Sequence, residues 1–522
     1  MLLLLCAFFV LVFSILCYAY CSLGLSVFNF LYCGGGLWSL FGVVDLVSIF
    51  VWLMLGLCFY YVLEYTHHYF GGGVAGFDLN KIIVVFVGVM ASLVVTGDFL
   101  TTLVFWEYLG VVSYFLILFY LSYLSLRSSV ITLVSSRFGD VCLFLLIGLC
   151  WWGSANEVIL CTLFFFVVFT KSASFPFISW LLEAMRAPTP VSSLVHSSTL
   201  VAAGVWFMMR YDLLLYSSNG VFIFYLCLLV TIFITGVCCF FFLDLKKIVA
   251  LSTCNNIAWC VFYILYGDSI LALFQLVSHG VSKCLLFMMV GDVMSGSGGS
   301  QSSNCVYPST LYGHWGLFGL YSIVLGLSGV PFIGVFFTKH LLLSGFCSFI
   351  NFPFFVIVLF CVFLSYFFCF FLCAILTNIK VSLSSGVYFL CGSGAMVYLW
   401  LITNYFIGGT LDENFIGFYW ITSLLLLFQI VAFVFSYCLY NSVVFTWWSS
   451  CLFGSDNLVE YIFNLFCHIT SFLSEFYYRW DKEVITIFGG GSGYPLVNVY
   501  KNLISLLFAS LIVLLSVICI LY

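Results

Sequence analysis

Apolar segments long enough to cross a lipid bilayer follow one another along nearly the whole chain, and only short polar or glycine-rich stretches separate them. A bilayer core about 30 Å thick requires about 20 apolar residues in a helix, and we count about 15 such segments. Because lipid provides no partner for backbone amides and carbonyls, the chain at membrane depth has to be helical. We therefore expect an all-α, polytopic transmembrane bundle without β-strands.

The composition agrees with a membrane protein and excludes several other classes. Of the 522 residues, 65% are hydrophobic and 6% are charged, whereas soluble domains carry roughly 25% charged residues. The net charge is −5 and the sequence has no basic run, so we expect no nucleic-acid partner. The 24 cysteines lie inside apolar runs without the paired spacing of metal ligands, so no metal site is expected.

The predicted spans divide the chain into five parts. The spans are residues 2–21, 39–64, 81–96, 98–121, 130–152, 158–185, 190–210, 219–242, 246–266, 269–292, 315–347, 354–378, 385–408, 417–440 and 501–521. The parts are N-terminal transmembrane helices (1–97), a first half of the core (98–245), a second half with the following helices (246–440), an amphipathic helix (441–500) and a C-terminal transmembrane helix (501–522). The first span has no clear cleavage site, so we expect it to be retained.

The sixth and eleventh predicted spans are too long for one helix, and each is interrupted near its middle. The sixth contains Lys171 followed by Pro176, and the eleventh contains Pro331 followed by Lys339. Proline removes a helix donor and clashes with the preceding turn, so each span should break. Broken helices at matched positions in two halves are typical of inverted-repeat transporters.

Residues 441–500 differ from the rest of the chain. They hold most of the late charges, such as Glu460 and Arg479, together with aromatic residues at helical spacing, such as Tyr461 and Phe472. This pattern predicts an amphipathic helix that lies along the membrane plane.

A few ionisable side chains fall deep inside the predicted spans. A charged group at the bilayer centre costs at least about 2.5–3.5 kcal/mol on insertion scales, so such groups are candidates for function. The candidates are Glu107, Lys171, Lys283 and Lys339, with His196 and His279 beside them. Desolvated lysine and histidine exchange protons readily near neutral pH, so we expect these groups to pass protons through trapped water.

The spacing of these residues suggests how they cooperate. We expect Glu107 and Lys171, on different helices, to form an ion pair that opens and closes as a proton switch. Gln275, His279 and Lys283 recur every four residues, so they share one face of a helix. Such a stripe suits a water-lined interior, and the alternative is hydrogen bonding between helices.

Most of the other polar residues have two interpretations. His196 is a relay group or a satisfied core histidine. Lys339 is the relay group on the far side or an interfacial side chain. Arg137 and Asp140 lie at a predicted helix start, where they are coupling residues or a loop-end ion pair. Lys246 is expected to be a surface anchor.

Several motifs occur together in the order and spacing of a known family. They are Trp106-Glu107-x-x-Gly110-x-x-Ser113, Ser136 to Asp140, Thr170 to Phe177, Glu183 to Val201, Asp244 to Ile248, His279-x-x-x-Lys283 and Pro331-Phe-x-Gly334 with Lys339. Across residues 45–345 the chain resembles the antiporter-like subunits of respiratory NADH:quinone oxidoreductase (complex I), in particular the chain 5 family.

The resemblance implies a proton-translocating, multi-pass subunit of the mitochondrial inner membrane. By residue, it implies a switch pair of Glu107 and Lys171, a central relay of His196, His279 and Lys283, an exit group at Lys339, and structural or coupling roles for Arg137, Asp140, Pro176 and Pro331. NADH, FMN, iron–sulfur clusters and ubiquinone would bind to other subunits, and no cofactor is expected in this chain. The implied partners are other membrane-arm subunits, especially the chain 4 neighbour, and lipids, with residues 441–500 as the family's lateral helix.

Four positions depart from the family's pattern. Gln275 and Ile178 stand where the family has histidines, Leu182 stands where it has a proline, and His340 replaces an aspartate beside the exit lysine. We expect these differences to change the details of the relay rather than the fold.

Two other functions share some of these features. A subunit of a multi-subunit cation/proton antiporter would carry the same motifs, but a lateral segment followed by a last helix favours the complex I subunit because it can clamp neighbouring subunits. A receptor or structural membrane protein would not require lysines at helix breaks, so Lys171 and Lys339 argue against that class.

Overall fold

The computed structural model describes residues 10–15, 17–18, 26–33, 38–152, 157–212, 221–306, 313–329, 335–349, 352–377, 419–440 and 452–488. The chain divides into two compact units, Met1–Ser455 and Asp456–Tyr522. The predicted spans 385–408 and 501–521, most of the span 2–21, and Pro331 lie outside the described residues.

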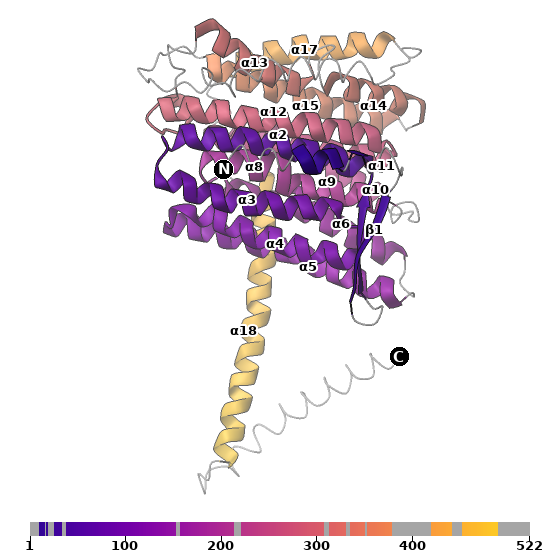
Figure 1. The fold of residues 1–522 in the computed structure, drawn as a ribbon, viewed down its shortest axis with the longest axis vertical. Helices are drawn as coiled ribbons and strands as arrows, with labels where there is room; N and C mark the ends of the chain where they lie inside the picture. The colour runs from indigo at the N-terminus through magenta and orange to yellow at the C-terminus, as the bar shows by residue number, and fades with distance from the viewer. Residues whose placement is uncertain are drawn as a thin grey trace. The chain divides into compact units, whose positions relative to one another are not determined.

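Helices of the first unit run side by side (Figure 1). They are α2 (Leu46–Tyr69), α3 (Val74–Val95), α4 (Phe99–Ile117), α5 (Tyr123–Trp152), α6 (Glu157–Ser172), α7 (Ser179–Ala184), α8 (Thr189–Leu194), α9 (Leu200–Arg210), α10 (Val221–Cys238), α11 (Leu245–Tyr266), α12 (Ser269–Gly296), α13 (Gly313–Ser328), α14 (Val335–Phe349), α15 (Phe352–Thr377) and α17 (Tyr419–Tyr440). Within the described ranges, ten helical spans are long and apolar enough to cross a membrane. The predicted helical membrane bundle is confirmed.

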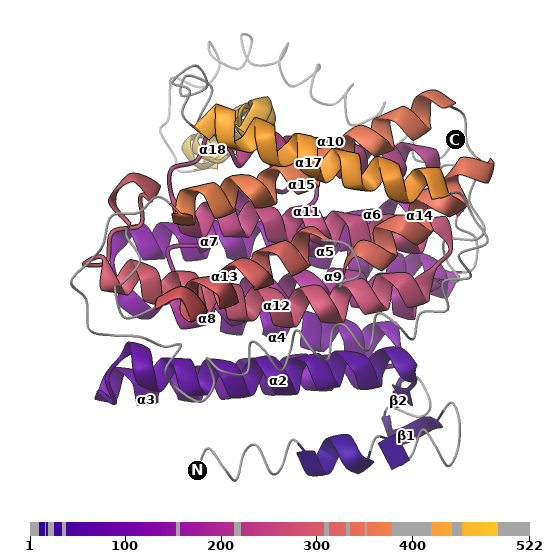
Figure 2. The same cartoon turned by 90° about the horizontal axis from the view of Figure 1, so that it is seen from above.

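Helix α12 occupies a central place in this arrangement. It packs against α2, α8 and α11, and also against α13 (Figure 2). A methyl group at Gly280 would lie 2.5 Å from the sulfur of Met54, so only glycine allows α2 to pack this close to α12. This close approach buries the polar stripe of α12 in the interior.

A β-hairpin precedes α2, so the expectation of no strand is wrong at this point. Strands β1 (Ser26–Cys33) and β2 (Trp38–Val44) pair antiparallel, with Ser26 opposite Val44. The predicted helix 39–64 therefore begins only at Leu46. Asp45 and Ser48 set this start with a capping box, in which each side chain accepts a hydrogen bond of 2.9 Å from the other's backbone amide.

The helix α5 begins earlier than expected, and this changes the position of two charged residues. Arg137 and Asp140 were predicted at a helix start, but they lie in the middle of α5. In the serine-rich segment before them the hydroxyls donate to the carbonyls three residues earlier, as Ser128 and Ser136 do. Such back-bonding satisfies polar side chains inside a membrane helix.

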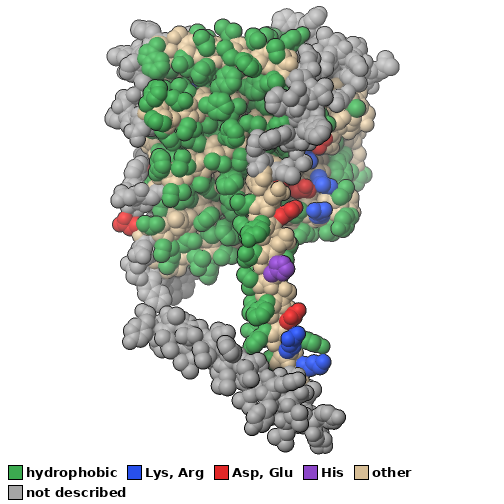
Figure 3. Space-filling view, turned by 180° about the vertical axis from the view of Figure 1, so that it is seen from behind, with side chains coloured by type: hydrophobic (Ala, Val, Ile, Leu, Met, Phe, Trp, Pro, Cys, Tyr) green, Lys and Arg blue, Asp and Glu red, His purple; other side chains and the backbone are tan. Residues whose placement is uncertain are grey.

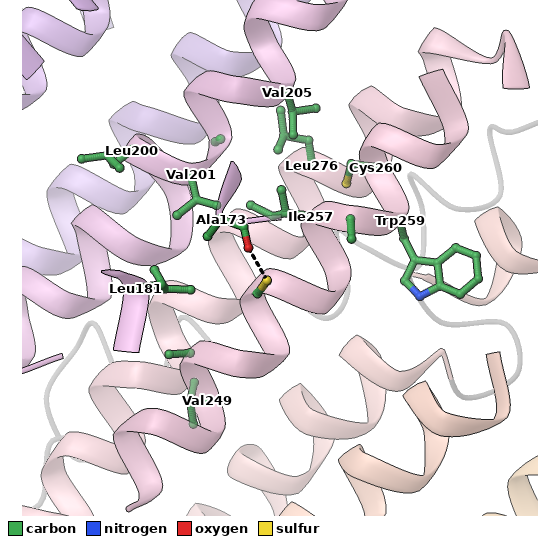
Figure 4. Packing of buried hydrophobic residues seen from close by; sticks show 14 of the residues in the cluster. Ala173, Leu181, Leu200, Val201, Val205, Val249, Ile257, Trp259, Cys260 and Leu276 are labelled. Carbon is green, nitrogen blue, oxygen red and sulfur yellow. Dashed lines mark hydrogen bonds between the residues drawn. The ribbon is translucent and has the colours of Figure 1, made fainter. Parts of the chain in front are cut away.

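The first predicted helix break is confirmed between α6 and α7. Helix α6 ends at Ser172, and Pro176 lies in the turns that lead to α7. Carbonyl groups near the break are satisfied by side chains, because the indole of Trp180 donates to Thr170 (3.0 Å) and the thiol of Cys254 donates to Ala173 (3.0 Å; dashed line in Figure 4). Buried hydrophobic side chains surround this bond.

The second predicted break lies between α13 and α14, which end and begin at Ser328 and Val335. A third irregularity was not predicted: the span 190–210 is not one α-helix. A π-helical turn, η2 (Val195–Thr199), separates α8 from α9. Such turns occur frequently at functional sites, and this one contains His196.

Almost all of α18 (Ser455–Phe488), a helix of 34 residues within the predicted amphipathic region, belongs to the second unit. Its charged side chains include Glu460 and Arg479, and Tyr461 and Phe472 are among its large exposed apolar residues. Along α18, Figure 3 shows hydrophobic side chains on one edge and charged ones on the other. The predicted amphipathic helix is thus confirmed, and its orientation along a membrane stays a prediction.

Candidate functional site

Three lysines lie in the interior of the first unit. Lys171 on α6, Lys283 on α12 and Lys339 on α14 are each 1% exposed. His196 on η2 and His279 on α12 are completely buried. Five of the six predicted relay residues are therefore held away from the surface of the chain.

Lys171 occupies the last turn of α6, at the first helix break. Its ammonium lies 5.2 Å from the centre of the Trp106 ring, a cation–π distance. Gly110 and Ser136 are close by, since a methyl group at Gly110 would lie 3.4 Å from the Ser136 hydroxyl and 3.9 Å from the ammonium. Among the described residues the ammonium makes no hydrogen bond. It is thus placed to interact with water.

Glu107 does not form the predicted ion pair with Lys171. Its side chain is 49% exposed and pairs with Arg137 at 3.4 Å. The same guanidinium lies 3.4 Å from Asp140, whose side chain is 5% exposed. Lys171 also interacts electrostatically with Asp140, Arg137 and Glu107. The structure therefore joins Lys171 to Glu107 through a charge cluster of four residues rather than by direct contact.

A small cavity connects Lys171 with His196. Its volume is about 10 Å³, which is room for about one water molecule. It is lined by Ser113, Ile117, Thr132, Ser135, Ser136, Thr170, Lys171, Trp180, Val195, His196 and Leu200. Most of these side chains carry a hydroxyl, an amine or a ring nitrogen, so a water molecule there would find the partners that it needs.

The predicted stripe on α12 is buried as expected. Gln275, His279 and Lys283 are at most 1% exposed. Lys283 donates a hydrogen bond to Ser252 on α11, and its ammonium lies 5.7 Å from the centre of the Phe368 ring on α15. Neither ring nitrogen of His279 has a hydrogen-bond partner among the described residues. Since buried polar groups are nearly always hydrogen bonded, the stripe suits a hydrated interior.

Lys339 on α14 is hydrogen bonded to the last residue of α13, at the second helix break. Its ammonium donates to the carbonyl of Ser328 (2.7 Å) and to the hydroxyl of Ser365 (2.8 Å), and it lies 4.2 Å from the centre of the Tyr366 ring. The interfacial interpretation is therefore excluded for this side chain, which is fully enclosed. The residue before it, Thr338, donates to Gln275 at 2.6 Å. Gln275 thus links α12 to α14.

Sequence reasoning missed the roles of several neutral partners and placed one lysine wrongly. Ser252 and Ser365 accept hydrogen bonds from Lys283 and Lys339. Hydroxyl residues inside strongly apolar spans were the available signal for both. Lys246 was predicted at the surface, but it is 6% exposed and donates to the carbonyl of Ala187 at 3.2 Å. That carbonyl lies just before α8, where an unpaired acceptor would be costly.

The arrangement can move positive charge through the interior. The lysines and histidines come from α6, η2, α12 and α14, and the intervening groups are hydroxyls and an amide. A row of ionisable groups at the centre of a helical bundle marks ion or proton pathways. Fold and site together define a polytopic helical membrane protein with a row of ionisable groups buried in its bundle.

Comparison with known sequences gives the family. The chain belongs to the NADH:quinone oxidoreductase/Mrp antiporter transmembrane family, whose sequence model matches residues 96–367. The matched region contains all six predicted relay residues.

Curated relatives are similar over part of their length. Similarity extends to NADH-ubiquinone oxidoreductase chain 5 from Locusta migratoria (34% identity, 61% of this chain and 58% of the relative) and from Artemia franciscana (33%, 62% and 60%). The corresponding chain from Caenorhabditis elegans is 36% identical over 49% of this chain and 50% of its own. The chain thus spans less than two thirds of the length of these relatives.

Two solved structures share the fold. A chain of the Mrp complex from Dietzia sp. DQ12-45-1b has a TM-score of 0.73 and 18% identity, covering 97% of this chain and 59% of its own. A chain of the membrane-bound sulfane sulfur reductase, an archaeal respiratory membrane complex, has a TM-score of 0.66 and 16% identity, covering 84% and 93%.

Proposed function

We propose that this chain is the chain 5-type subunit of respiratory NADH:ubiquinone oxidoreductase and that it moves protons across the membrane. The observation that carries the proposal is the burial of Lys171, Lys283 and Lys339 beside two helix breaks and a polar stripe. The similarity to chain 5 proteins of several animals supports the choice of enzyme.

In this proposal protons pass between neighbouring groups through water. The charge cluster of Glu107, Arg137 and Asp140 sets how strongly Lys171 holds its proton. The cavity beside Lys171 connects it to His196. From there the stripe of α12 leads to Gln275, which Thr338 links to the neighbourhood of the exit lysine.

The energy comes from redox chemistry in other subunits of the enzyme. NADH, FMN, iron–sulfur clusters and ubiquinone bind there, and this chain holds no cofactor and no metal. Its contribution is the buried path and the charged groups that gate it.

The proposed surroundings are the other membrane-arm subunits, in particular the chain 4-type neighbour, and lipids of the mitochondrial inner membrane. The exposed carboxylate of Glu107 suits contact with a neighbouring subunit because a charge on an outer helix face is unfavourable in lipid. Helix α18, with its apolar edge, suits the lateral position along the membrane.

A second candidate is a subunit of a multi-subunit cation/proton antiporter. The likeness to a chain of the Mrp complex over 97% of this chain favours it at the level of fold. Both candidates use the same buried groups, and they differ in the assembly that drives transport.

Purification of the native assembly tests this choice. Membranes are solubilised in mild detergent, and this chain is followed through native electrophoresis with an in-gel NADH oxidation stain. We expect the chain to migrate with a large NADH-oxidising complex. Migration in a smaller assembly without NADH oxidation, together with Na⁺-dependent proton exchange in vesicles, would favour the antiporter subunit.

A further inference from the structure

The imidazole of His68 and the carboxylate of Asp292 join the C-terminal ends of α2 and α12, and they form an ion pair when the histidine is protonated. Nε2 of His68 lies 3.0 Å from Oδ1 of Asp292. The histidine side chain is 25% exposed, whereas the aspartate side chain is completely buried. We propose that this pair is an access site through which protons exchange between the membrane surface and the buried relay. This inference rests on the proposed function and adds a route that the relay residues themselves do not supply.

The position of Asp292 is unfavourable for a carboxylate that serves only stability. It lies near the C-terminus of α12, where the helix dipole disfavours negative charge. Burial adds a desolvation cost that only a close positive partner offsets. His68 is in the last turn of α2, where the dipole favours a positive charge. The pair is thus formed by a surface group that can take up a proton and a buried group that can receive it.

A line of hydroxyls leads inward from this pair. Tyr65 lies about one turn before His68 on α2, with its ring centre 6.3 Å from the imidazole, and its hydroxyl is 3.4 Å from that of Thr189. Thr189, Ser193 and His196 follow at spacings of four and three residues, so they share one face of α8 and η2. The helical rise carries this line about 10 Å into the molecule.

All members of this line are enclosed, and a glycine allows them to meet. Tyr65, Thr189 and Ser193 are at most 4% exposed. A methyl group at Gly291 would lie 2.5 Å from the Tyr65 hydroxyl and 3.3 Å from Cβ of Thr189. Gly291 precedes Asp292 directly, so the hydroxyl line begins beside the ion pair. It ends at His196, which shares a cavity with Lys171.

The transfer balances as a simple proton exchange. Nδ1 of His68 takes a proton from water, and Nε2 releases its own proton to the carboxylate of Asp292. The imidazole is then neutral, and Asp292 is a neutral carboxylic acid. Asp292 passes the proton to water along the hydroxyl line, which restores the carboxylate. The imidazole, now protonated at Nδ1, returns to the tautomer protonated at Nε2 by exchange with solvent. The same steps in reverse release a proton to the surface.

The test uses the intact enzyme complex in sealed membrane vesicles, with Asp292→Asn as the main variant. We expect the rate of proton uptake to fall at least about tenfold, since a positioned proton-transfer group is removed. Sodium formate, the salt of a small weak acid, should restore part of the rate of proton uptake. The conservative variant Asp292→Glu should also restore part of it. The matched control is Asp78→Asn, which removes the exposed Asp78–Lys81 pair near the start of α3 and should leave pumping unchanged.

His68→Gln changes a partly exposed position, so it serves as the second variant if Asp292→Asn does not assemble. It should give the same loss of proton uptake, and added imidazole should restore part of the rate. If both variants pump normally while Lys171→Met loses proton pumping, the access site is overturned and the proposed function stays intact. A loss that neither formate nor Asp292→Glu restores would make the pair structural and also overturn it. Normal pumping in Lys171→Met as well would count against the proposed function itself.

Discussion

Glu107 illustrates how one residue's direction on a helix decides its partners. Trp106, Gly110 and Ser113 recur at spacings of four and three residues, and they form the inner face of α4. Glu107 follows Trp106 directly, so its side chain is rotated by about 100° from that face. The sequence predicts that Glu107 lies inside a membrane span, but the residues around it do not reveal that Arg137, rather than Lys171, is its ion partner.

At this scale we predict that Glu107 acts through Arg137. Glu107→Gln should weaken pumping because it frees the guanidinium that also holds Asp140. The double variant Glu107→Gln/Arg137→Gln should pump no worse than Arg137→Gln alone, measured as protons moved per electron. If the double variant instead shows the product of the two single-variant losses in pumping, the two residues act independently.

Helix breaks are the elements that the sequence predicts best. Pro176 and Pro331 mark them because proline cannot continue a helix, and the structure separates α6 from α7 and α13 from α14. The π-helical turn at His196 has no such marker. Its hydroxyls bond to carbonyls four or five residues back, as Thr199 does to Leu194, and an ordinary helix rich in serine has the same composition.

The hairpin before α2 escaped prediction for a similar reason. Residues 26–44 are apolar and rich in aromatic residues, and such a run suits a buried helix as well as a strand. What keeps β2 out of a helix is tertiary: Gly97 donates to Phe41 (2.9 Å) and Arg210 donates to Val43 (3.1 Å). Contacts between residues this far apart leave no local pattern in the sequence.

The contact between α5 and α6 allows a prediction at the element scale. A methyl group at Gly139 would clash with the hydroxyl of Thr170, next to Lys171. Gly139→Ala should therefore destabilise the fold by about 1–3 kcal/mol and shift the first helix break. Thermal unfolding of the detergent-solubilised complex measures the loss. Gly148→Ala on the same helix meets no atom within 4 Å and should be neutral or slightly stabilising.

Over the whole molecule, the buried path and the amphipathic helix are separate parts. The path lies within Met1–Ser455, and α18 belongs almost wholly to Asp456–Tyr522. Removing the chain from residue 456 onward should leave the first unit folded but reduce its retention in the complex, because the apolar edge of α18 is lost. Native electrophoresis measures this retention. Full retention of the shortened chain would contradict a clamping role.

The central claim is that enclosed ionisable groups carry protons through this chain, and Lys171 tests it most directly. Lys171→Met keeps the size and apolar stem of the side chain but removes its proton. In the assembled complex we expect the rate of proton transfer through this chain to fall at least about tenfold, since a transfer group is lost. Lys81→Met, at a lysine whose side chain is 71% exposed, is the control. Undiminished pumping by a normally assembled Lys171→Met complex would contradict the account.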